Sequence, residues 1–290
     1  MPDRIFLTGA SGYIGGAVAA TLRASGYEIV ALVRSSGAAT RLESAGFTVL
    51  RGDLADAGGL TAAARACDAV VHAAMQWGER AGALDDAAVT AMLDAMAGTD
   101  KTFLYTSGVW VFGSTGGRIA GESAPVRPPP VVAWRPAVER RVLDARERKV
   151  RGIVVSPAHV HGRGGGMGPK MVRQARETGV VRMVGDGSNH VTFVHIDDLA
   201  DLYLRALERS AAGELYIAAH GPAIRLRDVA DAAARAGGGR VEPWPLEEAR
   251  RKLGPIADAL VLDQRIASTK AGRLLGWVAR GPGVLEELHA

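Results

Sequence analysis

The chain has 290 residues, of which 48% are hydrophobic, and a formal net charge of +4 from 35 basic and 31 acidic residues. Acidic residues interrupt the densest basic stretch, residues 140–151, which argues against a nucleic-acid partner. No apolar run approaches the roughly 18 residues of a membrane helix, so we expect no membrane partner. A single cysteine, Cys67, excludes an intramolecular disulfide or a zinc cluster. We therefore expect a cytoplasmic protein whose first strand begins without a preceding signal peptide.

Strand and helix patterns alternate along the first half of the chain, as in a parallel sheet with crossover helices. The expected strands are Arg4–Thr8, Glu28–Arg34, Thr48–Arg51, Ala69–Ala73, Thr102–Ser107 and Gly152–Ser156. The expected helices are Gly12–Ala24, Ala38–Ala45, Leu60–Ala66, Asp85–Ala97 and Pro136–Arg146. Unbroken apolar strands are typical of a sheet buried on both faces. The predicted fold class is α/β, a Rossmann doubly wound parallel sheet with a small C-terminal α/β lobe.

The pattern changes in the second half. Residues Gly162–Gly168 form a glycine-dense stretch in which we expect no regular structure. Beyond it we expect a helix, a short strand and a helix at Asp197–Arg209, Glu214–Ala218 and Leu226–Ala236, followed by short helices and loops. The predicted division is a dinucleotide-binding core over residues 1–160 and a substrate-covering lobe over 161–290, with a return of the chain to the core near 190–220.

A glycine-rich loop separates the first strand from the first helix, the position at which Rossmann folds bind a pyrophosphate. Gly9 permits a tight turn, Gly12 lets the backbone approach the phosphates, and Gly15 lets the helix pack close to the strand. The helix N-terminus adds amide donors and a positive dipole end. A purely structural turn is the alternative. The predicted contacts are Gly9, Ser11, Gly12, Tyr13, Ile14 and Gly15.

The residue that ends the second strand is Arg34, where an NAD site would have an acidic side chain for the ribose hydroxyl. A guanidinium can hold a 2′-phosphate instead, with Ser35 as an additional donor. A solvated strand-end arginine is the alternative. The residues thus favour NADP as cofactor over NAD. Asp53 and Leu54, after the third strand, are expected at the adenine, and Ala73 and Ala74, after the fourth, let the cofactor lie across backbone. His72 is expected to be structural.

Taken together, these features resemble the extended and atypical short-chain dehydrogenase/reductases, the NAD-dependent epimerase/dehydratase family. Further resemblance lies in the segments 105–113 (YTSGVWVFG), 160–163 (VHGR), 194–200 (VHIDDLA) and 275–277 (LGW). The resemblance covers nearly the whole chain and implies oxidoreductase or epimerase activity on a small-molecule substrate. It also suggests a homodimer, because family members often pair through the helices that correspond to Asp85–Ala97 and Pro136–Arg146.

The catalytic pattern of that family is missing from its usual places. Gly108 stands where the family has Ser or Thr, and aligning the next helix on Glu139 puts Val131 at the tyrosine position and Arg135 at the lysine position. Valine cannot transfer a proton. Arg135 can anchor a ribose, although we expect Pro136 to push it out of helical geometry. A non-standard proton donor is therefore required if the chain catalyses the family's reaction.

Substitutes for the donor lie near the ends of the fifth and sixth strands, where the resemblance places the nicotinamide. Thr106 and Ser156 are assigned to the cofactor, and Ser107, His161 and Arg135 to catalysis, although each also fits loop packing or core. An apolar substrate pocket is predicted from Met75, Trp77, Trp110 and Trp134, with core tryptophans as the alternative. No metal site is expected. Two functions stay open: an NADP-dependent oxidoreductase or epimerase, and a catalytically weak or inactive NADP(H)-binding sensor.

Overall fold

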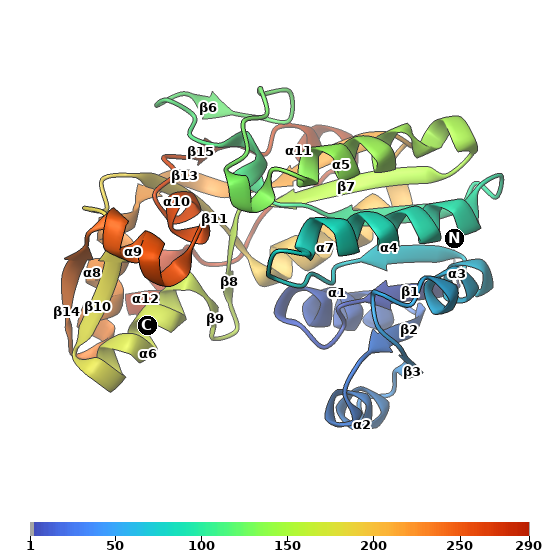
Figure 1. Ribbon diagram of the computed structural model, residues 1–290, viewed down its shortest axis with the longest axis horizontal. Helices are drawn as coiled ribbons and strands as arrows, with labels where there is room; N and C mark the ends of the chain where they lie inside the picture. The colour runs from blue at the N-terminus through green and yellow to red at the C-terminus, as the bar shows by residue number, and fades with distance from the viewer. Residues whose placement is uncertain (1–2, 290) are drawn as a thin grey trace. The chain divides into compact units, whose positions relative to one another are not determined.

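The computed structural model describes residues 3–289, which fold into two compact units (Figure 1). The first unit comprises Met1–Ser107, Trp134–Val155 and Ala200–Tyr216, and the second comprises Gly108–Ala133, Ser156–Leu199 and Ile217–Ala290. Each unit is therefore assembled from three separate stretches of chain. No helix within residues 3–289 has the length and apolar character needed to span a membrane. The predicted division at residue 160 stays a prediction.

The first unit is built on the predicted doubly wound sheet. Its strand order is β12-β7-β5-β4-β1-β2-β3, and every pairing from β3 to β7 is parallel. The direction of winding reverses between β1 and β4, and sheets of this kind bind ligands at the carboxyl ends of the strands beside that reversal. The strands are β1 (Arg4–Thr8), β2 (Glu28–Val33), β3 (Thr48–Arg51), β4 (Ala69–His72), β5 (Thr102–Thr106), β7 (Arg151–Pro157) and β12 (Glu214–Ala218).

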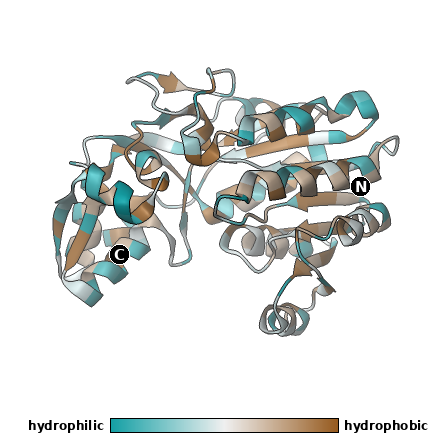
Figure 2. Cartoon of the chain, viewed as in Figure 1, coloured by the Kyte–Doolittle hydropathy of each residue, from teal (hydrophilic) through white to brown (hydrophobic). Residues whose placement is uncertain are grey.

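Apolar side chains cover both faces of this sheet. Phe6, Val70 and Phe103 join a buried cluster with helices α3, α4 and α5, whereas the equally buried Ile5 and Leu7 point to the opposite face, because alternate strand residues do so. Figure 2 shows the strands in hydrophobic colours and hydrophilic stretches on the helices. The helices are α1 (Tyr13–Ala24), α2 (Ser36–Ser44), α3 (Ala57–Ala66), α4 (Ala81–Met96), α5 (Arg135–Asp144) and α7 (Ile196–Arg209).

The second unit contains three small sheets, ordered β13-β11-β8-β9, β10-β14 and β15-β6. Its apolar core gathers side chains of β10, β11, α6, α8 and α12 around Phe193 and Val229. The strands are β6 (Ile119–Ala120), β8 (His159–Gly162), β9 (Gly165–Gly166), β10 (Val180–Val184), β11 (His190–His195), β13 (His220–Arg225), β14 (Arg240–Trp244) and β15 (Arg265–Ile266). The helices are α6 (Met167–Thr178), α8 (Leu226–Gly237), α9 (Leu246–Leu253), α10 (Ile256–Leu260), α11 (Lys270–Leu275) and α12 (Val284–His289), with short 3-10 turns η1 (Val109–Phe112) and η2 (Pro130–Val132).

The prediction that the glycine-dense stretch 162–168 lacks regular structure is wrong. Strands β8 and β9 pair there as a tight antiparallel hairpin, with Gly162 opposite Gly165. The two turn residues, Arg163 and Gly164, have φ of 51° and 70°, and two-residue hairpin turns with positive φ match the natural twist of paired strands. The glycines thus serve the hairpin, and α6 begins directly after it. Strand β14 likewise lies where we expect only short helices and loops.

Close packing of α1 on the first strand depends on Gly15. A Cβ added there would lie 2.2 Å from the Gly9 carbonyl oxygen, which is backbone and cannot swing away. Gly15→Ala is therefore expected to lower the free energy of unfolding by about 1–3 kcal/mol. Urea denaturation followed by circular dichroism measures this change. As a control, Gly37→Ala in α2, where an added Cβ meets nothing within 4 Å, should stabilise the protein by about 0.5–1 kcal/mol. Equal effects of the two substitutions would contradict the packing described.

Candidate active site

The glycine loop has the geometry of a phosphate cradle. Gly9 has φ +84°, and a Cβ added to it would lie 2.7 Å from the Ala73 carbonyl group and the Ala74 amide nitrogen. The Gly12 amide donates to the Gly9 carbonyl at 2.9 Å. Gly12 is the N-cap residue of α1, where no side chain makes a capping hydrogen bond and the first turn has no acidic residue. Because no side chain caps this helix end and no acidic residue of the first turn offsets its dipole, the loop fits a dinucleotide pyrophosphate.

The predicted contact residues on this loop divide by exposure. Ser11, Gly12 and Tyr13 are exposed, Ile14 is half-buried and Gly15 is buried. The first group can therefore face a ligand, whereas Gly15 acts through helix packing.

Arg34 follows β2 at the carboxyl edge of the sheet. Its side chain is 65% exposed, and its Nη1 lies 3.8 Å from the Asp53 carboxylate, a loose surface pair. Asp53 also accepts the Ala55 amide at 2.9 Å, and Ser35 accepts the Ala38 amide at the start of α2. Leu54, which follows Asp53 in the sequence, is buried. The guanidinium thus retains donors for an anionic group at this edge.

A buried polar network lies beneath the loop. The Ala74 amide donates to Thr8 Oγ1 at 3.3 Å, so the Thr8 hydroxyl hydrogen is available to His72 Nδ1 at 2.7 Å. His72 Nε2 then donates to Asp85 at 3.1 Å, and the Tyr105 hydroxyl donates to the other Asp85 oxygen at 2.7 Å. Each donor has one acceptor, which fixes the His72 tautomer and ties the ends of β1, β4 and β5 together.

Asp85 is the charged member of that network. Burial raises the pKa of its carboxyl, but the interaction with His72, the hydrogen bond from Tyr105 and the positive charge of Arg135 together outweigh burial and hold the pKa below its ordinary value. His72 is 1% exposed and fully engaged, which gives a structural account of this residue. The sequence pattern does not reveal the role of Asp85, although an acidic residue on a helix face with Val89 and Met92 was a usable signal.

Arg135 is the first residue of α5, so the prediction that Pro136 pushes it out of the helix is wrong. Proline is tolerated in the first helical turn, because the missing amide has no intrahelical acceptor there. Arg135 is 5% exposed; its Nη1 donates to the Thr106 carbonyl at 2.8 Å, and its Nη2 lies 2.9 Å from Met75 Sδ. Its Nε is buried with no hydrogen-bond partner among the described residues. The guanidinium carbon lies 4.8 Å from the centre of the Trp134 ring.

Ser107 lies directly after β5 and is held to β7 by its amide, which donates to the Val155 carbonyl at 2.8 Å. Its hydroxyl makes a short hydrogen bond with the Glu139 carboxyl of α5. Both residues are buried, and burial raises the pKa of Glu139 above its ordinary value despite the opposing effects of Ser107 and Arg135. The neighbouring Thr106 hydroxyl accepts a hydrogen bond from Tyr203 at 2.7 Å. The structure thus brings Ser107, Thr106 and Arg135 together, with Met75 and Trp134 alongside.

Three of the remaining predicted residues, Trp110, Ser156 and His161, lie in the second unit, and Trp77 lies in the first. His161 is 2% exposed and its Nδ1 lies 2.7 Å from Glu287, which also contacts His195. Ser156 is buried with no partner for its hydroxyl among the described residues. Trp110 packs its ring edge-on to His159, whereas Trp77, in the first unit, is 59% exposed. Within residues 3–289, no group of three or more His, Cys, Asp and Glu side chains is arranged to hold a metal ion.

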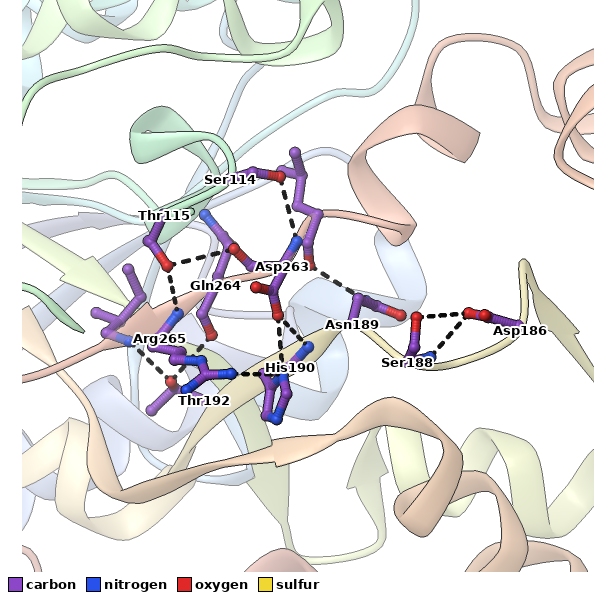
Figure 3. Close-up of polar contacts among 12 residues, drawn as sticks. Ser114, Thr115, Asp186, Ser188, Asn189, His190, Thr192, Asp263, Gln264 and Arg265 are labelled. Atoms are coloured by element: carbon purple, nitrogen blue, oxygen red, sulfur yellow. Dashed lines mark hydrogen bonds and ion pairs between the residues drawn. The ribbon is translucent and has the colours of Figure 1, made fainter. Parts of the chain in front are cut away.

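A polar network in the second unit fixes the segment that follows β5 (Figure 3). The Gln264 side-chain amide donates to the Val109 and Gly113 carbonyls at 2.8 and 2.9 Å. Asp263 accepts from the His190 backbone amide at 2.6 Å and lies 2.9 Å from the His190 ring, and its own amide donates to Ser114 (Figure 3). These contacts hold the turn η1, which lies within residues 105–113, a segment that resembles the epimerase/dehydratase family. Sequence reasoning did not find Gln264, because its partners are about 150 residues away.

Comparison with known proteins identifies the class. The profile of the NAD dependent epimerase/dehydratase family matches residues 5–219. The chain belongs to this family and is an enzyme of its oxidoreductase and epimerase class. It is 30% identical to an uncharacterized protein of Saccharomyces cerevisiae over 99% of this chain and 98% of that one. It is 28% identical to the 2-alkyl-3-oxoalkanoate reductase of Stenotrophomonas maltophilia, over 89% and 83% of the two chains.

Solved structures share the fold. The dTDP-glucose 4,6-dehydratase of Streptomyces venezuelae, determined with NAD bound, superposes with a TM-score of 0.82 at 20% identity, over 99% of this chain and 95% of that one. The Rossmann fold class predicted from the sequence is confirmed.

Asp85 accepts two buried hydrogen bonds, and an asparagine in its place would turn an N–H toward one of the two donors. Asp85→Asn is therefore expected to lower the free energy of unfolding by about 1–3 kcal/mol at neutral pH. The folded-state pKa of Asp85 is lowered, so its contribution is complete above the ordinary value of about 3.9 and is lost as pH falls through the folded-state pKa. The gap between wild type and variant should therefore narrow on acidification, as urea denaturation at several pH values would measure.

The matched control is Asp94→Asn, which removes an exposed carboxylate paired with Arg148 and should change the free energy of unfolding by less than about 0.5 kcal/mol. A pH-independent gap for Asp85→Asn would show that ionisation of this carboxyl does not stabilise the fold.

Proposed function

We propose that the protein is an NADP-dependent oxidoreductase that reduces a small carbonyl compound or oxidises the corresponding alcohol. The observation that carries the proposal is the uncapped N-terminus of α1 beside Gly9 and Gly12, with Arg34 at the adjacent strand end. The pyrophosphate would bind at the loop, and Arg34 would bind the 2′-phosphate of the adenosine half. Ala73 and Ala74 would lie under the cofactor. The nicotinamide supplies or accepts the hydride when the cofactor is bound.

A carbonyl substrate is supported by the named relative that reduces a 2-alkyl-3-oxoalkanoate. Met75 and Trp134, which lie against Arg135, offer apolar surface for such a substrate next to a cationic group. Trp77 and Trp110 stay predicted members of the pocket, as do Thr106 and Ser156 at the cofactor and His161 in catalysis. The homodimer and the cytoplasmic location also stay predictions.

A second candidate function is a sensor that binds NADP(H) without turnover. The observation that favours it is Val131, which lies in the 3-10 turn η2 and offers no hydroxyl where the family has its catalytic tyrosine. The two functions separate in one assay, because only the enzyme oxidises NADPH in the presence of a carbonyl compound.

We expect purified protein to oxidise NADPH with at least one member of a panel of aldehydes and ketones that includes the 3-oxo ester ethyl acetoacetate. With that substrate, Arg34→Ala should raise KM for NADPH about 10- to 100-fold and leave KM for NADH nearly unchanged, because the lost hydrogen bonds involve only the 2′-phosphate. The control is Arg148→Ala, an exposed arginine of the same unit paired with Asp94.

Equal changes for the two cofactors would remove the reason for preferring NADP. Tight NADPH binding without turnover across the panel would favour the sensor.

A further inference from the structure

The pair formed by Ser107 and Glu139 is an unusual feature of the first unit. A carboxyl group 5% exposed lies on α5 between the apolar residues Val138 and Val142, and its hydrogen-bond partner is a serine hydroxyl 7% exposed. Burying a carboxylate beside a neutral hydroxyl is costly, whereas burying a protonated carboxylic acid there is not. The pair is therefore better suited to a neutral acid than to an anion.

Ser107 lies at the half of the site where hydride transfer would take place. Strands β1, β4 and β5 are adjacent and in register, with Thr8 beside His72 and His72 beside Tyr105. The adenosine half of the cofactor would extend from the glycine loop over β2, where Arg34 lies, so the nicotinamide half would extend the other way, over β4 and β5. Ser107 is the residue that follows β5 at this carboxyl edge.

The two phenols close to this position are already engaged. The Tyr105 hydroxyl donates to Asp85, and the Tyr203 hydroxyl donates to Thr106; both side chains are fully buried. Burial also raises the pKa of each phenol above its ordinary value, which opposes ionisation during turnover. Neither tyrosine therefore replaces the missing phenol at Val131.

We propose that Ser107 is the proton donor to the substrate oxygen and that Glu139 is the positioning residue that supplies Ser107 with its proton. This inference rests on the proposed reductase function. In the structure the Ser107 hydroxyl donates to the Glu139 carboxyl, the direction that an ionised Glu139 requires. A protonated Glu139 would reverse this bond and donate to Ser107 Oγ, which would leave the Ser107 hydrogen free to point to a substrate carbonyl oxygen. When Glu139 is ionised, Ser107 must donate to it instead, and the substrate loses its donor.

The proton movements balance with the hydride. With the cofactor bound, NADPH would supply a hydride with its electron pair to the carbonyl carbon, and the carbonyl π electrons would form a bond to the Ser107 hydrogen. The Ser107 O–H bond breaks as Ser107 takes the proton of Glu139. The products are the alcohol, NADP⁺ and an ionised Glu139, which Arg135, one helical turn earlier, stabilises electrostatically. Solvent returns the proton through Ser107 after the alcohol leaves. Oxidation of the alcohol runs the same steps in reverse.

The test compares Glu139→Gln and Ser107→Ala with wild type in NADPH-dependent reduction of ethyl acetoacetate or whichever panel member wild type reduces. Each variant should lower kcat about 10²- to 10⁴-fold, the range of a general acid. The double variant should lose no more than the worse single variant, because the two residues act as one unit. Affinity for NADPH, measured by calorimetry, should change less than about twofold, since neither side chain is assigned to the cofactor. Asp94→Asn serves as the surface control.

The pH profile separates a proton relay from a merely structural role. Wild-type kcat for reduction should fall as pH rises through the raised pKa of Glu139, because the ionised form cannot give a proton. Glu139→Gln should lose that descending limb, since glutamine does not titrate. Infrared spectroscopy adds a readout that needs no turnover: the C=O band of a protonated carboxylic acid should be present at the pH of fastest reduction and absent in Glu139→Gln.

Unchanged kcat and pH profile in Glu139→Gln, or an ionised Glu139 at the pH of fastest reduction, would overturn the relay while leaving the reductase function intact. Absence of turnover by wild type that still binds NADPH would overturn the proposed function itself, and the relay with it.

Discussion

The close approach of three backbone segments at the glycine loop is the constraint on which the rest of the first unit depends. Gly9 lies against the backbone of Ala73 and Ala74, and Gly15 lies against Gly9. No side chain separates these segments, so the N-terminus of α1 opens at the edge where the winding of the sheet reverses. The free helix end and the need for small residues directly after β4 follow from the same contact.

Buried polar groups maintain that arrangement. Thr8, His72, Asp85 and Tyr105 link the ends of three adjacent strands to α4. Arg135 and Glu139 place two ionisable side chains on the apolar face of α5. Buried ionisable groups of this kind are costly to keep unless they have partners, and their concentration at one sheet edge supports the proposal that this edge is the functional site. Apolar side chains in place of these ionisable groups would stabilise the fold without the cost of burying polar atoms.

The sequence predicts the first half of the fold well for a physical reason. Strands buried on both faces are unbroken apolar runs, and the buried strands β1, β2 and β4 begin at the predicted residues. The second half is harder because its strands are short and mixed in polarity. Glycine and proline lie in the first turn of α6, and these residues hide the helix from a reading of the sequence. Proline is nevertheless tolerated in a first helical turn.

Part of the site can also be predicted from the sequence. Local motifs reveal the glycine loop and Arg34, because their function follows from neighbouring residues. The pairings of Ser107 with Glu139 and of Gln264 with Val109 join distant stretches, which no local pattern encodes. One signal was available for Glu139: together with Arg135 it shares the helical face of Val138 and Val142, and charged residues on an apolar face call for a partner.

Calorimetric titration with NADPH of wild type and Gly12→Asp tests the central claim most directly. A Cβ at Gly12 would approach only the Gly9 carbonyl oxygen, at 3.2 Å, so the variant should fold, but its carboxylate would occupy the phosphate position and repel it. The account predicts one NADPH bound per wild-type chain and no measurable binding by a folded Gly12→Asp. Absence of binding to wild type, or equal affinities of the two proteins, would contradict it.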